Sequence, residues 1–570
     1  MSQATDEVGP RHLRRNARRS LILGAGAVVV VLVVVIVIVT SGGGSSPSSD
    51  RGSSTTTTTK PPPPPPPNPA HSRTFLGPDG LESSWVIAEN KLPGTTGWQI
   101  RHQPKTGSIA GFASVPYAAR GNHVVLYVDT TARRFHVMAY RMGYYGGAGG
   151  RLVWRSPEVA GKVQPACPLT PGVNMVSCEN WTPSLSFTVS SAFLPGDYLL
   201  RLVGSGNEQS YVFLVIWDPS SHAAYVIKND LYTEQAWNTY GGYDFYQGIG
   251  SCPPGVYPTC NRARIVSMDR PFAGNGAPAD FFSNEYPLVR FAEEEGLDVT
   301  YADDLTLEQH PKFLLQHRVL LSLGHDECWS LGERVAAESA MKHGVNMVFF
   351  GASAVLRHVR LQRSAIGPDR EIVDYRDSSE DPLNGRANPL LVTGNTWFSP
   401  PTDWPESGFT GEMYAGFLEP GSPSAPFVVN DAKSWIFKGT GLHDGSQLPG
   451  VIEADFDHVA PSWPMPANLE VLGHSPVLLA DSQTDLGTWG KYTYSDMTYY
   501  TSPTSKAGVL DTGDNNWIFS MTPCGKKSPG CSAPEVQKIT GNLFRLFGQG
   551  PAGRLVPSVA NWQQVVPPGS

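Results

Sequence analysis

The chain has 570 residues, with 51 acidic and 43 basic side chains and a formal net charge of -8. This length is more than one hydrophobic core normally holds, so we expect two domains or one domain with large insertions. The acidic balance, with no basic stripe beyond the N-terminus, argues against a nucleic-acid-binding protein.

The N-terminal 39 residues have the pattern of a membrane anchor. Arginines at positions 11, 14, 15, 18 and 19 precede an uncharged apolar run at 21–39. A run of this length can cross a hydrocarbon core of about 30 Å as a helix. The positive-inside bias predicts a cytoplasmic tail at 1–20 and an outer-face location for all that follows. A cleaved signal peptide is the alternative, but the run is long for one and no clear A-x-A site follows.

Residues 40–71 have the composition of a linker. Gly, Ser and Thr give way to a proline run at 61–67, which predicts a flexible piece followed by a stiff polyproline spacer. A proline-rich ligand for another protein is the alternative. We therefore expect globular structure to begin at residue 72, with one domain at 72–218 and another at 219–570.

The seven cysteines indicate in which cellular compartment the protein lies. Six of them form pairs that are close in sequence and lie in loop-like stretches: Cys167 with Cys178, Cys252 with Cys260, and Cys524 with Cys531. No pair has zinc-site spacing, so we predict three local disulfides, which persist in an oxidising compartment. The seventh, Cys328, is either a nucleophile or a small buried apolar residue.

The sequence of the first domain predicts an all-β fold. Residues 123–128, 134–140 and 198–202 alternate or run apolar between turns, which predicts a β-sandwich. A glycine-rich stretch at 141–151 resembles a phosphate loop, but no Lys-Ser/Thr pair closes it and no helix follows. It therefore predicts a tight turn between two strands.

The second domain alternates strands and helices. We expect strands at 224–227, 299–301, 319–323 and 345–351, and helices at 287–295 and 330–343. This order predicts a mostly parallel sheet with right-handed crossovers. Ligands bind outside the carboxyl ends of such strands, so the loops after Ile227 and Leu323 converge if their strands are neighbours.

Each of these two loops carries unusual side chains. Residues 229–246 crowd aromatic, polar and glycine residues together, which indicates a wall for a small ligand or a source of phenolate ligands. An aromatic plug against the β-sandwich is the alternative. The second loop, Gly324-His325-Asp326-Glu327, places three chemically active side chains directly behind a buried strand.

These strings together resemble the large subunit of N,N-dimethylformamidase. The matching pieces are 229–230 with 237–242, 324–330, 344–352, 439–442, and the acids Glu453 and Asp455. The resemblance spans roughly residues 110–550 and includes the 141–151 turn. It implies a glutamine-amidotransferase-like α/β domain beside the β-sandwich. A shared family is weak evidence for a shared substrate.

The family enzyme hydrolyses a small amide with a mononuclear iron held by two tyrosines and one glutamate. By resemblance Glu327 matches the glutamate ligand, His325 a supporting group and Glu453 the catalytic carboxylate. A Lewis-acidic metal polarises the amide carbonyl and acidifies bound water, while a carboxylate takes the proton of the attacking water.

The resemblance assigns the two tyrosine ligands to positions in this chain less directly. The family usually has Tyr where this chain has Trp237, and a tryptophan cannot ligate a metal. Tyr240 and Tyr246 are the expected ligands, with Tyr243 behind them. The family also commonly has an aromatic residue in the place of Cys328, which indicates a different pocket shape.

Simpler roles exist for each of these residues. His325 and Asp326 would then hydrogen-bond the turn backbone, and Glu327 would pair with an arginine such as Arg264 or Arg270. Glu453 and Asp455 would share a solvated strand face.

We expect a membrane-anchored, exoplasmic hydrolase that acts on a small non-peptide amide with a mononuclear metal. The alternative is a non-catalytic cell-surface binding or envelope-associated protein that keeps the fold without the metal. A homo-oligomer or a small partner subunit is left open by the sequence.

Overall fold

The computed structural model describes residues 67–100, 108–252, 260–386, 388–394, 396–418, 421–478, 492–525 and 531–566. The predicted cytoplasmic tail, the predicted membrane span at 21–39 and nearly all of the predicted linker lie outside these ranges. None of the helices within them is long and apolar enough to cross a bilayer.

Two sheets of mostly antiparallel strands form the β-sandwich that the sequence predicted. The smaller sheet contains, in spatial order, β11 (Leu185–Thr188), β5 (His123–Thr130) and β3 (Ile109–Ala113). The larger contains β4 (Tyr117–Ala118), β13 (Gln209–Ile216), β12 (Gly196–Gly204), β6 (Arg134–Met142) and β7 (Gly150–Arg155), with β8 (Val159–Ala160) paired to β6. Along β5 every second side chain is buried, because one face of the strand lines the core between the sheets.

The glycine-rich stretch at 141–151 is the predicted turn between strands β6 and β7. Its residue Arg141 is fully buried and forms a two-pronged ion pair with Glu293, with nitrogen-oxygen distances of 2.5 and 3.0 Å. Tyr145 also accepts a hydrogen bond from Arg141 and donates one to Glu89. The turn therefore fastens the sandwich to α3 (Tyr286–Glu294) of the following domain.

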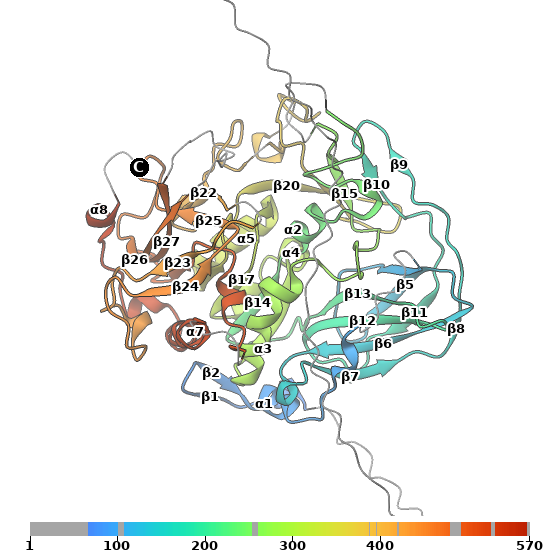
Figure 1. The fold of residues 1–570 in the computed structure, drawn as a ribbon, viewed down its shortest axis with the longest axis horizontal. Coiled ribbons are helices and arrows are strands. Elements are labelled where there is room, and N and C mark those ends of the chain that lie inside the picture. The colour runs from blue at the N-terminus through green and yellow to red at the C-terminus, as the bar shows by residue number, and fades with distance from the viewer. Residues whose placement is uncertain are drawn as a thin grey trace, which may run out of the picture. The chain divides into compact units, whose positions relative to one another are not determined.

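A seven-stranded sheet is the centre of the second domain (Figure 1). Its order is β16 (Val299–Asp303), β14 (Tyr225–Asn229), β17 (Val319–Leu323), β19 (Asn346–Phe350), β28 (Gly508–Asp511), β27 (Tyr492–Thr501) and β26 (Glu470–Leu478). The first five strands are parallel and the last two join antiparallel. Because β14 and β17 are neighbours, the loops that follow them meet, as the sequence predicted.

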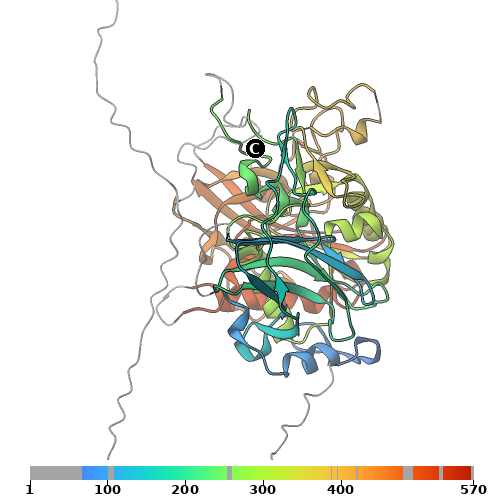
Figure 2. The same cartoon turned by 90° about the vertical axis from the view of Figure 1, so that its right-hand side faces the viewer.

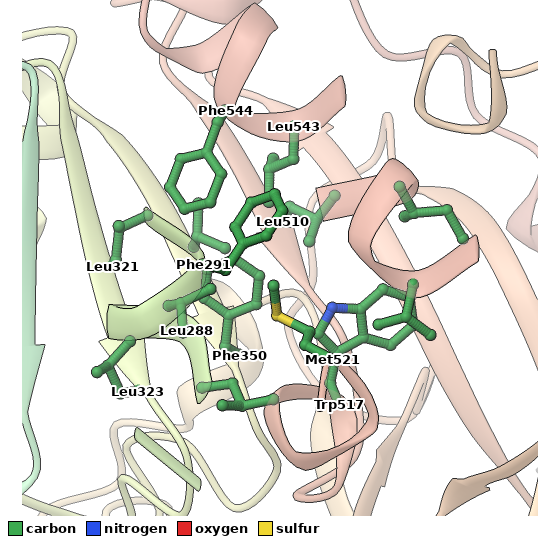
Figure 3. Close-up of a cluster of buried hydrophobic side chains, with 14 of the residues drawn as sticks. Leu288, Phe291, Leu321, Leu323, Phe350, Leu510, Trp517, Met521, Leu543 and Phe544 are labelled. Atoms are coloured by element: carbon green, nitrogen blue, oxygen red, sulfur yellow. The ribbon is translucent and has the colours of Figure 1, made fainter. Parts of the chain in front are cut away.

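Helices cover both faces of this sheet, which explains why its parallel strands are buried throughout. Alternate strand residues such as Ile227 and Leu321 face a core shared with α3 and α7 (Ala533–Phe547). Figure 3 shows this cluster, in which Phe544 of α7 and Phe291 of α3 approach Leu321 and Phe350. The opposite face packs against α4 (Asp304–Gln309) and α5 (Leu331–Lys342).

Smaller sheets surround the carboxyl ends of the main strands. One has the order β15 (Ile265–Ser267), β21 (Glu371–Val373), β20 (Arg357–Gln362) and β18 (Cys328–Ser330). Two antiparallel pairs join β22 (Met413–Phe417) to β25 (Asp455–His458) and β23 (Ala425–Val428) to β24 (Gln447–Ile452). β18 was not predicted, because three residues are too few to show a periodicity.

The segment before the sandwich packs on the second domain, although it falls within the predicted range 72–218. It contains β1 (Thr74–Leu76), β2 (Leu81–Ser83) and α1 (Ser84–Asn90). Trp85 and Val86 belong to the same core as α3 and α7, and the backbone of β2 is bonded to residues 296–298. In Figures 1 and 2 this segment, coloured blue, lies at the bottom of the view.

All three predicted disulfides are present, joining Cys167 to Cys178, Cys252 to Cys260 and Cys524 to Cys531. Two of the bonded cysteines, Cys167 and Cys178, lie beside β9 (Leu169–Thr170) and β10 (Met175–Val176). The free Cys328 is buried, and burial raises the pKa of its thiol well above the usual range. Its surroundings are those of a small apolar core residue and disfavour the thiolate.

Candidate functional site

The glycine after β17 produces the turn that carries the candidate residues. Gly324 has a φ of 58°, and a Cβ there would lie 2.8 Å from the Cβ of Asn284. Only glycine combines this left-handed conformation with so close an approach. The chain consequently turns sharply at the carboxyl end of the sheet and presents His325, Asp326 and Glu327 there.

Asp326 stabilises this turn through buried polar contacts. Its carboxylate lies 2.7 Å from the ammonium group of Lys228 on β14 and accepts a hydrogen bond from Ser322. The same lysine pairs with Asp304 and, at 2.7 Å, with Glu333. All four charged groups are buried, and the carboxylates satisfy the lysine that would otherwise be costly inside the protein.

Glu327 is the centre of the site. Its Oε1 accepts hydrogen bonds from the Tyr246 hydroxyl and, at 3.1 Å, from the Trp237 indole nitrogen. The guanidinium of Arg357, on β20, lies 3.6 Å from its Oε2. Burial disfavours the charged carboxylate and raises the pKa of Glu327 to about 7, although Arg357 acts in the opposite direction.

His325 joins Glu327 to a second carboxylate. Its Nε2 lies 2.8 Å from Oδ2 of Asp455 and 3.8 Å from Oε2 of Glu327. Burial alone would lower the pKa of His325, but the adjacent Asp455 outweighs it and the net shift is upward. Asp455 also receives a hydrogen bond from Asn515 at 3.3 Å.

Two aromatic side chains from the predicted aromatic loop form one wall. The rings of Trp237 and Tyr246 stack with centroids 3.7 Å apart and an interplanar angle of 11°. Trp237 is 39% exposed, so solvent reaches part of this aromatic pair. The idea that these rings form a wall for a small ligand stays a prediction.

The structure brings together three of the five predicted site residues, namely His325, Glu327 and Tyr246. Tyr240 packs instead against Phe112 and Trp181 of the sandwich. Among the described residues no contact joins it to Glu327. Glu453 is exposed at the end of β24, and no contact in the described chain joins it to His325 or Glu327.

Sequence reasoning also missed two partners. Glu327 pairs with an arginine, as one alternative held, but with Arg357 and neither of the two suggested ones. Arg264 pairs with Glu380, and Arg270 donates to backbone carbonyls. Asp455 contacts His325, so it does not share the exposed position of Glu453. Asp455 was among the acids that carry the family resemblance, but no role was assigned to it. No signal in the sequence pointed to Arg357.

A comparison with known protein families identifies the family of this chain. The family described as N,N-dimethylformamidase beta subunit-like, C-terminal, matches residues 136–531 of this chain. The chain belongs to this family. A search of curated proteins found no match to this chain.

The chain also resembles part of one solved structure. It is the cycloisomaltooligosaccharide glucanotransferase of Paenibacillus sp., complexed with cycloisomaltoheptaose, with 10% identity and a TM-score of 0.13. The match covers 24% of this chain and 18% of that chain.

Membership of the N,N-dimethylformamidase family raises the question of the iron that the resemblance implied. Glu327 and Tyr246 are in contact and supply one carboxylate and one phenol. The place of a second phenol beside Glu327 is taken by Trp237, whose indole nitrogen is a donor and not a ligand. The described residues therefore do not provide the set of two tyrosines and one glutamate.

Proposed function

We propose that this protein is a hydrolase of small, non-peptide amides. The observation that carries the proposal is the position of His325, 2.8 Å from Asp455 and 3.8 Å from Glu327 at the carboxyl end of the sheet. Membership of a dimethylformamidase-like hydrolase family supports the same reaction class. No step of the proposed reaction passes through a metal, because the described donor set does not match the expected one.

Glu327 is the proposed general base. A carboxylate whose pKa lies near 7 is basic enough to accept a proton from water and is still ionised in part at neutral pH. The hydrogen bonds from Tyr246 and Trp237 fix its orientation. The attacking water adds to the amide carbon, and its proton passes to Oε of Glu327.

His325 is the proposed general acid. The charge of Asp455 favours the protonated imidazole, which then carries a proton into the site. When the C–N bond breaks, the nitrogen of the leaving amine takes that proton. The products are a carboxylic acid and an amine, and the two side chains exchange protons with solvent before the next turnover.

A screen for amine release from formamide, N-methylformamide, N,N-dimethylformamide and acetamide tests this function. Wild-type protein is compared with Glu327→Gln, His325→Asn and a control, Glu380→Gln, which alters a surface acid paired with Arg264. We expect turnover that both site variants reduce by about 100-fold or more. Turnover that is equal in all four proteins would overturn the proposal.

We further propose that the hydrolase faces the outside of the cell from a membrane anchor. The apolar run at 21–39, with five arginines before it, supports the anchor and its orientation. The three disulfides are consistent with an oxidising compartment. Protease treatment of intact cells tests this directly, since the globular region is then digested while a cytoplasmic marker survives.

A surface binding protein is the second candidate, favoured by the open stack of Trp237 on Tyr246. An exposed aromatic face beside a carboxylate can hold a small amide or amine without hydrolysing it. Saturable quenching of tryptophan fluorescence by the same amides, without amine release, would favour this function. Trp237→Phe removes the indole nitrogen and identifies the responding residue.

A further inference from the structure

Three buried carboxylates meet next to the candidate site without belonging to it. Asp230 follows β14, Glu234 lies on α2 (Leu231–Ala236), and Glu285 ends the π-helix Phe281–Glu285. One oxygen from each lies within 4.8 Å of the others. All three residues are at most 4% exposed, so solvent does little to separate their charges.

The group lacks a balancing positive charge. In the described part of the chain, no salt bridge joins Asp230, Glu234 or Glu285 to a lysine, arginine or histidine. Neither oxygen of Asp230 accepts a hydrogen bond from a described N–H or hydroxyl, and the group that it meets is the Glu285 carboxyl. Burial of such a cluster without a counter-ion is unfavourable by several kcal/mol per charge.

A neutral side chain provides independent evidence for a missing ligand. Asn229 is 2% exposed and donates its amide nitrogen to Glu285, which directs the side chain at the cluster. Its Oδ1 has no hydrogen-bond partner among the described residues. A buried carbonyl oxygen on the amide group that contacts Glu285 is a typical addition to an oxygen-only cation site.

The site also has room for solvent ligands. A small cavity of about 40 Å³ lies between the β-sandwich and α2, and Asn229, Glu234 and Glu285 are on its wall. Phe112 and Phe213 of the sandwich also line it. Water in this cavity can complete a coordination shell that three carboxylates leave open.

We infer that Asp230, Glu234 and Glu285 bind a hard divalent cation of the Ca²⁺ kind, with Asn229 as a further oxygen ligand. All available donors are oxygens, which disfavours metals that prefer nitrogen or sulfur. The cation holds the end of β14, α2 and the π-helix together. Asn284 of that π-helix packs against Gly324, so the cation positions the turn that carries His325 and Glu327.

The test uses the full chain, stripped with a chelator and dialysed against Ca²⁺, Mg²⁺ or Mn²⁺ in turn. Metal content by mass spectrometry and the thermal unfolding midpoint are measured for each. We expect about one equivalent of Ca²⁺ and a rise in the midpoint of several degrees, because a ligand of the folded state stabilises it. A stronger response to Mg²⁺ would assign the same site to the smaller ion.

Variants distinguish cation binding at this site from a change in stability caused by any buried acid. Glu285→Gln and Glu234→Gln each lower the affinity by at least tenfold and abolish the thermal response. Glu406→Gln is the matched control, because Glu406 is also buried with neither oxygen bonded, but lies outside the cluster. It keeps full cation binding. If the wild-type chain takes up none of the three ions, the carboxyls hold protons instead and the inference fails, whatever the result of the amide screen.

Discussion

Trp237 donates its indole N–H to the carboxylate of Glu327 across 3.1 Å. This contact places a non-ligating ring where a second tyrosine would complete the donor set that the family resemblance implies. It also fixes the carboxylate against Tyr246. The identity of residue 237 therefore decides whether Glu327 serves as a metal ligand or as a hydrogen-bonded acid.

Restoring a phenol at position 237 should create an iron site. Trp237→Tyr places two phenols and one carboxylate together, a hard oxygen set suited to ferric iron. We expect well under one equivalent of iron in the wild type, and a clear gain with a visible phenolate-to-iron absorption band in the variant. Trp463→Tyr is the control. Near-stoichiometric iron in the wild type would contradict this prediction.

Removing the charge of Asp455 should weaken the proposed acid. In Asp455→Asn the carboxylate no longer favours protonated His325, so the pKa of this histidine falls. We expect amide hydrolysis at pH 7 to drop by about 10- to 100-fold, with the histidine titration followed by NMR. Glu453→Gln, examined in parallel, shows whether the nearby exposed acid has the role that the resemblance assigned to it. A larger loss in Glu453→Gln than in Asp455→Asn would contradict our assignment.

The rate of hydrolysis should fall as the pH decreases through about 7. Glu327 acts as a base only when ionised, and burial raises its pKa to about 7. Because Arg357 lowers that pKa, Arg357→Met should move the acidic limb of the kcat/KM profile to higher pH. A limb that stays in place would show that another group titrates.

The buried Glu406 should make the protein less stable as the pH rises. Burial raises its pKa to about 8, so the folded state keeps this proton between pH 4.5 and 8 while the unfolded state loses it. Glu406→Gln should therefore stabilise the fold at pH 7 by an amount on the order of 2–3 kcal/mol. The gain should vanish near pH 4.5 in denaturant titrations, and a gain independent of pH would exclude this cause.

Gly324 should tolerate no side chain. Gly324→Ala introduces a Cβ 2.8 Å from that of Asn284, at a φ of 58°. We expect a loss of stability of about 2 kcal/mol or more together with loss of amide hydrolysis. Gly408→Ala, where nothing lies within 4 Å and φ is not in the left-handed range, is the matched control.

Much of the fold could be predicted because the signals were local. The strand at Val319–Leu323 was predicted with its observed ends, since four apolar residues and Ser322 form a short run that stops at a glycine. The parallel order of β14 and β17 followed from the alternation of strand and helix. Tyr240 could not be placed, because a loop of alternating aromatic and glycine residues has no period that says which ring faces which partner. Glu453 could not be placed, because the left-handed backbone of Ala454 breaks the alternation that the sequence predicted there. Arg357 lies 30 residues beyond Glu327, and only the pairing of β18 with β20 brings the two together.

The buried pair of Arg141 and Glu293 limits how the molecule can move. Both side chains are fully buried where the β-sandwich meets α3. Separating them would leave two unpaired charges in an apolar interior. Breaking such a pair costs about 3–5 kcal/mol, which leaves the open arrangement sparsely populated at equilibrium. We therefore expect a ligand to reach Glu327 past the exposed Trp237, without a separation of the sandwich from the α/β domain.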